Sequence, residues 1–577
     1  MPFLSIIPAI RTVPGVEIFD YAFEEGSDIK VGDLLRVPFR KRQIPALVAK
    51  ISDESLFASK AVSLGKPQAL LRFGPTMVDL LEQTARRTFS SRPSILLSWL
   101  RAVPKRFKTP KLETLSEIQL GLALPRRETR YLIDVLHGND GLIETAKACP
   151  GRTLILSAWK RNADAIGTEL DCPVLHSEIP ATAAWKLASG FMLADERTLV
   201  ATKLGAWLAC FADTVLVEEP ENDDFKQDEL SPRFDARWLA DECSRLRPKL
   251  SLINFSQTPQ LSYQPVVTPD LDLEVSFEAT GRSGKSGLEE LMGSTLNRIT
   301  DALEENREVV IVHPVRGERA RYACSSCGWF AACPSCSYPV SQFHSFGICR
   351  KCGKKSQLPA ECPRCNGSDF SRGRPGLERM GQQLPKIGNA DKIKTINLTQ
   401  AQEGSFPKKS LVVITDAALL AGAVEDIRRR ERLVIAWRRL AAKALAASAT
   451  LVVQGKDEVL ALCQRTLTST GLEEERRIEM EERQLFNYPP AVRLVKILVD
   501  GDEQRSNALS ERLTADLPES WRIQGPYPVP HRSAARGARF IIQVIVPLEI
   551  ADSVLYDTFD RYKKDAYIDL DPIAFFG

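Results

Sequence analysis

Two kinds of hydrophobic pattern alternate along this chain of 577 residues. Short apolar runs rich in β-branched residues are separated by longer stretches in which polar and apolar residues mix. Runs this short, joined by segments long enough for a crossover helix, are typical of buried parallel strands in α/β folds. The pattern predicts one set of strands at Thr153–Ser157, Thr198–Thr202, Thr214–Val217 and Leu250–Phe255, and a second set at Glu308–Val312, Leu411–Thr415 and Thr450–Gln454.

The two ends of the chain carry different patterns. Near the N-terminus, from Val31 to Ile51, two apolar runs flank a basic turn bounded by prolines, which predicts a hairpin in a small β barrel. Near the C-terminus, strand-like runs with at least one helix among them predict an α+β domain; these runs are Val492–Asp500, Trp521–Gln524 and Arg539–Val546.

The predicted fold class is therefore α/β and multidomain, because 577 residues are too many for one hydrophobic core. Its parts are a small N-terminal β barrel, two α/β lobes, a cysteine-rich insertion in the second lobe and a C-terminal α+β domain. The boundaries that we expect are 1–110, 111–263, 264–320 with 373–465, 321–372 for the insertion, and 466–577.

Composition narrows the class of protein only moderately. The chain is 44% apolar and 26% charged, with a net charge of +3, so any surface for nucleic acid must be a local patch. The N-terminus lacks the basic start and apolar core of a signal peptide, and no apolar run reaches the ~20 residues that span a bilayer. We expect a cytoplasmic protein that does not enter a membrane.

Cysteine spacing supplies the strongest chemical signal. Eight of the thirteen cysteines form four Cys-x-x-Cys pairs, at Cys324/Cys327, Cys333/Cys336, Cys349/Cys352 and Cys362/Cys365. Two such pairs complete a closed tetrahedral four-thiolate zinc site, so four pairs predict two zinc ions. A disulfide framework does not suit reduced cytosolic thiols, whereas an iron–sulfur cluster is an alternative that spacing leaves open.

Four pairs can combine in three ways. The segment between Cys336 and Cys349 is long enough for a ribbon hairpin, whereas the segment between Cys327 and Cys333 is tight for one. This difference favours a nested arrangement in which the inner pairs share one ion and the outer pairs share the other. The expected ligand sets are Cys324, Cys327, Cys362 and Cys365 for the first zinc, and Cys333, Cys336, Cys349 and Cys352 for the second.

Two further segments are candidates for nucleic-acid contact. In Phe19-Asp20-Tyr21 an acid stands between two aromatic residues, and aromatic faces can stack bases while a carboxylate accepts hydrogen bonds; an ordinary strand would show the same triplet. Residues 86–111 hold eight basic residues and no acid, which suits either phosphates or a solvated helix face. The eight are Arg86, Arg87, Arg92, Arg101, Lys105, Arg106, Lys108 and Lys111.

Motifs along nearly the whole chain resemble those of the PriA family of replication restart proteins, which are relatives of superfamily 2 DNA helicases. The motifs are the four cysteine pairs with Gly373-x-x-Gly376-Leu377-Glu378-Arg379, Val37-Pro38-Phe39, His176-Ser177, Phe225-Lys226-Gln227, Pro232–Arg237, Glu482-Arg483, Tyr488-Pro489-Pro490, Gly525-Pro526 and Asp569–Pro572. The resemblance implies two RecA-like lobes, and its zinc arrangement is the nested one.

The resemblance also implies DNA contacts and partners. The pocket that holds the 3′ end of a nascent strand would fall on Phe19, Asp20 and Lys60, although Arg40 replaces the family's glycine after Val-Pro-Phe. We expect phosphate contacts from Arg101, Lys105 and Arg106, and from Arg536 in a basic turn. Expected partners are forked and single-stranded DNA, primosome and replisome-loading proteins and single-stranded DNA-binding protein, with the chain a monomer at the nucleoid.

The family's motor motifs are degraded. The P-loop position reads Leu136–Thr145 without a lysine, and Val217-Glu218-Glu219-Pro220 replaces Asp-Glu-Glu-His. Ser256-Gln257-Thr258-Pro259 stands for Ser-Ala-Thr-Pro, and Trp437–Ala444 lacks the arginine pattern that contacts a γ-phosphate. The family's winged-helix domain has no room between Pro104 and Leu115. Losing the phosphate cradle, metal site and arginines together leaves nothing to stabilise phosphoryl transfer.

The sequence therefore predicts a replication restart protein that binds stalled or abandoned forks and initiates primosome assembly and helicase reloading without unwinding DNA. The alternative is a divergent ATP-dependent 3′–5′ helicase that uses Lys285 and Ser286 in the near P-loop Ala279–Ser286. A flexible Gly/Ser linker is the better interpretation of that stretch. We expect no catalytic residues.

Overall fold

The structure is a computed structural model that describes two compact units, each considered by itself. It describes residues 2–574 except 14, 41, 101–125, 132–140, 194–195, 228–231, 259, 262–267, 281–290, 314–321, 328, 335–338, 344–345, 350–353, 371–389, 423–426 and 530–538. Unit 1 comprises Met1–Ser256, Ile550–Lys563 and Ile568–Leu570, and unit 2 comprises Gln257–Glu549, Lys564–Tyr567 and Asp571–Gly577.

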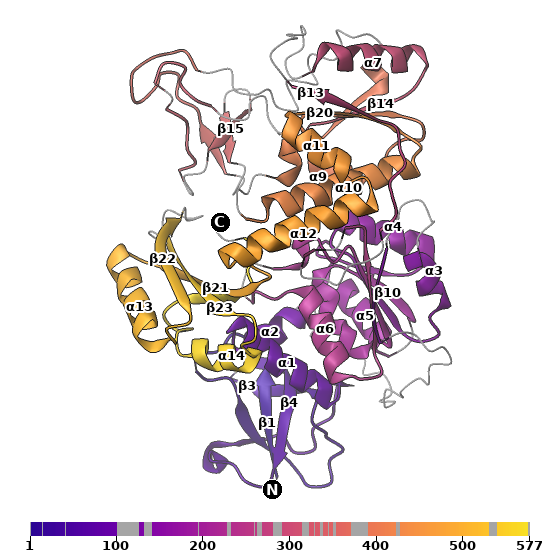
Figure 1. Ribbon diagram of the computed structural model, residues 1–577. Coiled ribbons are helices and arrows are strands. Elements are labelled where there is room, and N and C mark those ends of the chain that lie inside the picture. The colour runs from indigo at the N-terminus through magenta and orange to yellow at the C-terminus, as the bar shows by residue number, and fades with distance from the viewer. Residues whose placement is uncertain are drawn as a thin grey trace. The chain divides into compact units, whose positions relative to one another are not determined.

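Unit 1 begins with a six-stranded sheet of order β5-β2-β1-β4-β3-β6 (Figure 1). Its strands are β1 Phe3–Pro8, β2 Phe19–Ala22, β3 Asp33–Phe39, β4 Arg42–Ser52, β5 Val62–Ser63 and β6 Leu71–Arg72. The predicted hairpin is confirmed, because β3 and β4 pair antiparallel from Leu34↔Leu47 to Phe39↔Arg42. The closed barrel stays a prediction.

A second, parallel sheet of unit 1 has the order β7-β12-β11-β8-β10-β9. Its strands are β7 Arg127–Tyr131, β8 Thr153–Leu156, β9 Val174–Leu175, β10 Thr198–Ala201, β11 Thr214–Glu218 and β12 Ser251–Ser256. The four strands expected in this region are confirmed within a residue or two. The short edge strands β7 and β9 were not predicted, because neither shows a buried apolar run.

Helices cover both faces of this parallel sheet (Figure 1). The helices of unit 1 are α1 Pro75–Thr88, α2 Arg92–Trp99, α3 Gly141–Ala148, α4 Lys160–Leu170, α5 Ala181–Met192, α6 Ala236–Leu246, α14 Asp552–Asp560 and the 3₁₀ helix Lys203–Phe211. Alternate residues of β8 face opposite cores: Leu154 and Leu156 pack toward α5 and α6, whereas Ile155 packs toward α3 and α4. A strand buried on both faces must be apolar throughout, which is why its sequence was readable.

A buried ion pair joins two segments of unit 1 that are far apart in the sequence. Lys226 Nζ lies 2.7 Å from Asp569 and donates to the Leu570 carbonyl at 3.0 Å. Both side chains are almost wholly buried, at 4% and 6% exposed. A buried charge is tolerated only with a partner, so each of these residues depends on the other.

Unit 2 contains a five-stranded parallel sheet of order β13-β20-β19-β14-β18. Its strands are β13 Val275–Ala279, β14 Val309–Val312, β18 Ile393–Ile396, β19 Leu411–Ile414 and β20 Thr450–Gly455, and the three predicted strands are among them. Its helices are α7 Gly293–Glu304, α9 Leu398–Glu403, α10 Arg429–Ala446 and α11 Asp457–Arg465. That the two parallel sheets are RecA-like lobes stays a prediction.

Two smaller sheets complete unit 2. The cysteine-rich segment forms the antiparallel sheet β15 Val340–Phe343, β16 Phe346–Cys349 and β17 Lys355–Gln357. The predicted C-terminal α+β arrangement is confirmed by β21 Val492–Asp500, β22 Arg522–Val529 and β23 Arg539–Pro547 with α13 Glu503–Asp516. Helix α12 spans Ser469–Phe486, and β24 spans Tyr567–Leu570. Among the described helices, none is long and apolar enough to cross a membrane. The five domain boundaries stay predictions.

Replacing Lys226 by Met should lower the free energy of unfolding by about 3 kcal/mol, because Asp569 would remain buried without its cation. Urea unfolding followed by tryptophan fluorescence measures the change. The matched control is Lys66→Met, whose partner Glu24 lies 3.9 Å away at the exposed surface, and which should change stability by less than about 0.5 kcal/mol. Equal midpoints for the two variants would contradict this account of the buried pair.

Candidate DNA-binding edge and cysteine cluster

The three residues expected at a 3′ end come from neighbouring parts of the N-terminal sheet. Phe19 and Asp20 open β2, and Lys60 ends the 3₁₀ turn Ala58–Lys60, two residues before Val62. Because Val62 pairs in parallel with Tyr21, the chain register brings Lys60 alongside the start of β2. Lys60 is exposed, and Phe19 packs edge to face on Phe39 at 5.0 Å.

Two serines hold the Asp20 carboxylate. Ser5, its partner across the β1–β2 ladder, donates to Oδ1 at 2.8 Å, and Ser55 donates to Oδ2 at 2.5 Å. Each carboxylate oxygen can accept more than one hydrogen bond, so a half-buried Asp20 keeps capacity for a ligand. Sequence analysis did not identify Ser5 or Ser55, because only the strand register and the loop path bring them to Asp20.

Arg40 occupies a backbone conformation that favours glycine. Its φ is +54°, in the left-handed region, at the turn between β3 and β4. A side chain there is strained by contact with its own backbone, which glycine avoids. The resemblance places a glycine at this position, and the turn geometry explains why.

Three residues of the basic segment 86–111 are neutralised within unit 1. Arg86 pairs with Asp557 at 2.7 Å, and Arg87 lies 3.8 Å from Asp552. Arg92 contacts Glu17 at 2.9 Å and Glu82 at 2.5 Å. In this structure the guanidinium group of each of the three thus lies near a carboxylate. The expected contacts Arg101, Lys105, Arg106 and Arg536 lie outside the described residues.

The four outer cysteines converge on one point. The sulfur atoms of Cys324, Cys327, Cys362 and Cys365 all lie within 4.8 Å of one another, which could hold a metal ion. The shortest separations are 3.5 Å between Cys324 and Cys365 and 3.6 Å between Cys327 and Cys362. The backbone amide of Cys327 lowers the pKa of the Cys324 thiol to about 6, which favours the thiolate that metals bind.

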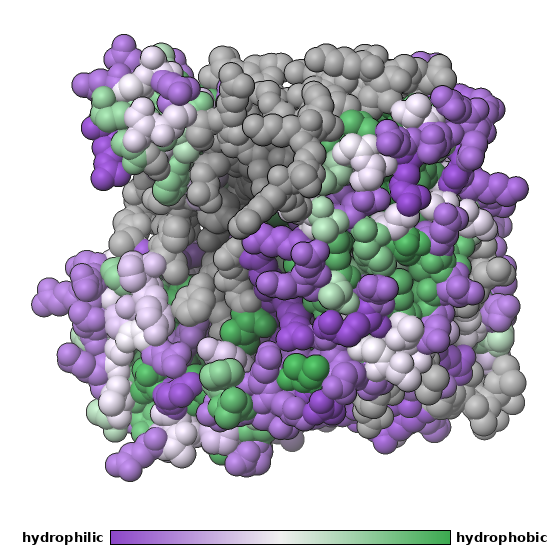
Figure 2. All heavy atoms as spheres, turned by 45° about the horizontal axis from the view of Figure 1, so that its top comes forward, coloured by the Kyte–Doolittle hydropathy of each residue, from purple (hydrophilic) through white to green (hydrophobic). Residues whose placement is uncertain are grey.

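Tight turns shape this cluster. Asn366 N–H donates to the Cys362 carbonyl at 2.8 Å, and Arg364 N–H donates to Cys362 Sγ at 3.4 Å. The surface of the segment is mostly hydrophilic: in Figure 2 its described part, at upper left, carries purple side chains outermost with paler ones between. In the described part of the segment, the buried apolar cluster is small: it comprises Ala331, Cys333, Val340 and Cys349, with Tyr322, Trp329 and Leu358 packed against it.

The inner set is described only in part. Cys333 and Cys349 are buried beside Val340, and Cys349 pairs with Val340 across the β15–β16 hairpin that spacing predicted. Cys336 and Cys352 lie outside the described residues. The structure thus brings together one complete set of four cysteines and half of the other.

An acidic residue at the position of the family's metal-directing motif forms hydrogen bonds beside the first parallel sheet. Glu218, at the end of β11, is buried and accepts hydrogen bonds from Ser157 at 2.5 Å and Asn162 at 2.8 Å. In the former P-loop stretch, the described part begins α3 with Gly141, and Leu142 and Ile143 pack into the core. In the described part of this stretch, residues 141–145, no residue is basic, and the Arg130 guanidinium nearby donates to Thr145 Oγ1 at 3.0 Å.

Two buried cations of α10 also form their hydrogen bonds inside the protein. Arg438 is 1% exposed and donates to the carbonyls of Thr466 at 2.5 Å and Pro269 at 3.3 Å. Lys443 is 3% exposed and donates to the carbonyls of Gln402 and Gly404. These side chains stand where the resemblance expects arginines that contact a γ-phosphate, yet they point into the protein and satisfy loop carbonyls.

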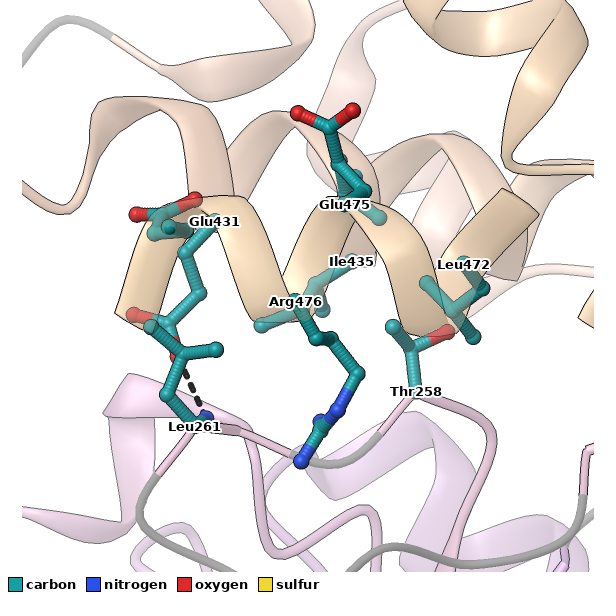
Figure 3. Close-up of a pocket in the computed structure, with 9 residues that line it drawn as sticks. Thr258, Leu261, Glu431, Ile435, Leu472, Glu475 and Arg476 are labelled. Carbon is teal, nitrogen blue, oxygen red and sulfur yellow. Dashed lines mark hydrogen bonds between the residues drawn. The ribbon is translucent and has the colours of Figure 1, made fainter. Parts of the chain in front are cut away.

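A small cavity of unit 2 lies beside Thr258, between α10 and α12 (Figure 3). Its volume is about 20 Å³, enough for about one water molecule and far too small for a nucleotide. Glu431 accepts the Leu261 backbone N–H at 3.0 Å on one side, and Arg483 lies 3.2 Å from the Glu431 carboxylate. Burial alone would raise the pKa of Glu431, but Arg428 and Arg483 lower it.

Relaxing the turn at residue 40 tests the backbone account. Arg40→Gly should be about 1 kcal/mol more stable than Arg40→Ala, because only glycine adopts positive φ without strain. Thermal unfolding of the two variants measures the difference. At Val48, inside β4, the order should reverse, since glycine weakens a strand interior. An alanine variant at position 40 as stable as the glycine variant would contradict the strain.

Two family models match separate parts of the chain. The 3'DNA-binding domain (3'BD) model matches residues 10–100, and the primosomal protein N C-terminal domain model matches residues 484–573. These ranges contain the edge formed by Phe19, Asp20 and Lys60, and the sheet formed by β21, β22 and β23.

Relatives match more of the chain at low identity. "Replication restart protein PriA" of Thermotoga maritima is 27% identical over 228 residues, which cover 37% of this chain and 30% of the relative. The protein of the same name from Synechocystis sp. is 22% identical over 419 residues, covering 58% of this chain and 48% of the relative. The chain thus matches less than half the length of either relative.

Among solved structures, the DUF1998 helicase MrfA bound to DNA is similar over 63% of this chain and 46% of its own, with 10% identity and a TM-score of 0.27. A likeness this weak supports no conclusion. The two family models and the named relatives agree with each other and with the motifs in the sequence. These comparisons support the similarity of this chain to the PriA family of replication restart proteins.

Proposed function

We propose that this chain binds stalled or abandoned replication forks through the 3′ end of the leading strand, and initiates primosome assembly and helicase reloading without unwinding DNA. The observation that carries the proposal is the edge of the N-terminal sheet, where Asp20 is held by two serines beside Phe19 and Lys60. This edge lies inside the segment that matches a 3′ DNA-binding domain.

The chemistry of this edge suits a strand that ends in a hydroxyl. A carboxylate accepts a hydrogen bond from a 3′-hydroxyl and repels a 3′-phosphate, while an exposed lysine attracts the backbone phosphates of the same strand. The Phe19 ring packs on Phe39 at the same end of the strand, although consecutive strand residues point to opposite faces of the sheet. Asp20 would therefore provide specificity, and Lys60 would provide affinity.

Three features support the absence of a motor. The stretch 136–145 has no lysine, the acid Glu218 is bound by Ser157 and Asn162, and Arg438 and Lys443 hold buried carbonyls. A transferring phosphoryl group needs cations and a metal aimed at it. Side chains that already satisfy the protein interior cannot supply them without unfolding local structure.

The cysteine-rich segment would bind two structural zinc ions. Cys324, Cys327, Cys362 and Cys365 fit the closed four-thiolate set of one ion, and Cys333 and Cys349 would join Cys336 and Cys352 for the other. Since the segment has so little apolar core, metal binding would supply much of its folding free energy. Its polar surface would receive partner proteins, among them replisome-loading proteins and single-stranded DNA-binding protein.

Fork binding tests the proposed specificity. The protein should bind a fork whose leading arm ends in a 3′-hydroxyl about 10-fold more tightly than one ending in a 3′-phosphate, because a hydrogen bond to a charged group contributes about 1.5 kcal/mol or more. Asp20→Asn should reduce this preference to less than about threefold. Fluorescence anisotropy of labelled forks gives both affinities.

Asp53→Asn is the matched control, since it removes an exposed acid from the nearby loop after β4. It should keep the hydroxyl preference. A parent protein indifferent to the 3′ group, or an Asp20→Asn variant that keeps the full preference, would overturn the proposal.

Zinc content tests the two ligand sets. The purified chain should carry two zinc ions, and Cys362→Ser should carry one and melt at a lower temperature, because the outer site loses a ligand. Elemental analysis by mass spectrometry measures the metal. Cys149→Ser, outside the cluster, should retain both ions. Iron instead of zinc, or no loss of metal from Cys362→Ser, would refute the assignment.

A further inference from the structure

Exposed apolar side chains gather around Asp20. Of the large hydrophobic residues that are exposed in the described part of the chain, Ile18, Leu56, Phe57 and Val62 lie within a few residues of Asp20 or of its partner Ser55. Phe57 is 62% exposed and Leu56 is 98% exposed. Single exposed apolar residues are ordinary, but a group of them beside a polar site indicates a surface for a partner.

The backbone of Phe57 belongs to the network that holds Asp20. Ser55 Oγ donates to the Asp20 carboxylate at 2.5 Å and accepts the Phe57 N–H at 3.0 Å. The Phe57 carbonyl in turn accepts the Lys60 N–H at 2.8 Å. One chain of hydrogen bonds therefore runs from the carboxylate through Phe57 to the turn that carries Lys60.

This network has a consequence for the aromatic ring. The backbone of Phe57 is bound on both sides, to Ser55 Oγ and to the Lys60 N–H, and Ser55 in turn binds Asp20. Its ring is nevertheless exposed rather than packed into the sheet. The fold thus anchors the backbone of an exposed aromatic residue to the serine that binds Asp20.

We propose that Phe57, with Leu56 beside it, packs against the terminal base of the leading strand at a fork. The inference rests on the proposed 3′-end recognition. A base presents a flat, uncharged face of the size of a phenyl ring, and base–aromatic stacking is a large and sequence-tolerant source of affinity. Asp20 then reads the sugar end, Lys60 attracts the phosphate, and Phe57 covers the base.

A lipid or a protein could also contact the exposed side chains of Leu56 and Phe57, but the neighbouring groups favour nucleic acid. Lys60 is exposed at the end of the turn Ala58–Lys60. Leu56 and Phe57 lie within the segment matched by a 3′ DNA-binding domain model. The Asp20 carboxylate near Leu56 and Phe57 would repel an acidic lipid headgroup. The base of a strand that ends in a hydroxyl satisfies the carboxylate, the cation and the ring together.

The test combines a side-chain change with removal of the base. Phe57→Ala should weaken binding to a fork with an intact 3′-terminal nucleotide about 10-fold, as loss of one stacked base predicts. It should leave binding unchanged when the terminal nucleotide is abasic. Phe57→Trp should bind the intact fork at least as tightly as the parent. Fluorescence anisotropy with the full chain measures all affinities.

Phe486→Ala is the matched control, because Phe486 is similarly exposed, at 57%, but lies at the end of α12. It should bind both forks as the parent does. Equal losses of Phe57→Ala on intact and abasic forks, or no loss on either, would overturn the inference, the latter leaving a protein or lipid as the occupant.

The two proposals fail in different ways. If the parent ignores the 3′ group but Phe57→Ala still loses affinity only for the intact base, hydroxyl recognition is wrong and stacking by Phe57 stands. If the parent prefers the hydroxyl and Phe57→Ala behaves as the parent on both forks, the 3′-end site stands and stacking by Phe57 is wrong.

Discussion

Burial of charge is the constraint on which the two parallel-sheet regions depend. A charged group removed from water must find partners inside the protein, and here the partners include backbone carbonyls, hydroxyls and opposite charges. Arg438 and Lys443 satisfy loop carbonyls in unit 2, and Lys226 satisfies Asp569 in unit 1. In each case the charged side chain is bound to groups inside the protein.

The N-terminal sheet shows the opposite use of polar groups. Asp20 is positioned by Ser5 and Ser55 at the edge of the sheet, but it is only half buried and keeps acceptor capacity. The exposed neighbours Lys60 and Phe57 add a cation and an aromatic face. These groups are the basis of the proposed strand-end site.

The sequence predicted the parts of the fold that are set by local pattern. Strands buried on both faces, such as β8 and β19, are apolar at every position, and the β3–β4 hairpin has a turn signal between two apolar runs. The edge strands β7 and β9 were missed, because an edge strand needs no apolar run. The outer cysteine set was expected from spacing, since two residues between thiolates suffice to aim both at one ion.

What the sequence could not supply was the set of long-range partners. Ser5 meets Asp20 only through the strand register, and Lys226 meets Asp569 across most of the chain. The positive φ at Arg40 was likewise not predicted, although the family's glycine at this position indicates such a conformation. Contacts of this kind depend on topology, so no local pattern encodes them.

The central claim is that fork recognition here is separate from nucleotide hydrolysis. The most direct test is ATP turnover by the purified chain in the presence of saturating forked DNA, together with the Lys285→Ala variant. The account predicts no turnover above the protein-free rate for either protein. DNA-stimulated turnover that disappears in Lys285→Ala would contradict it and would show that this chain is a divergent motor.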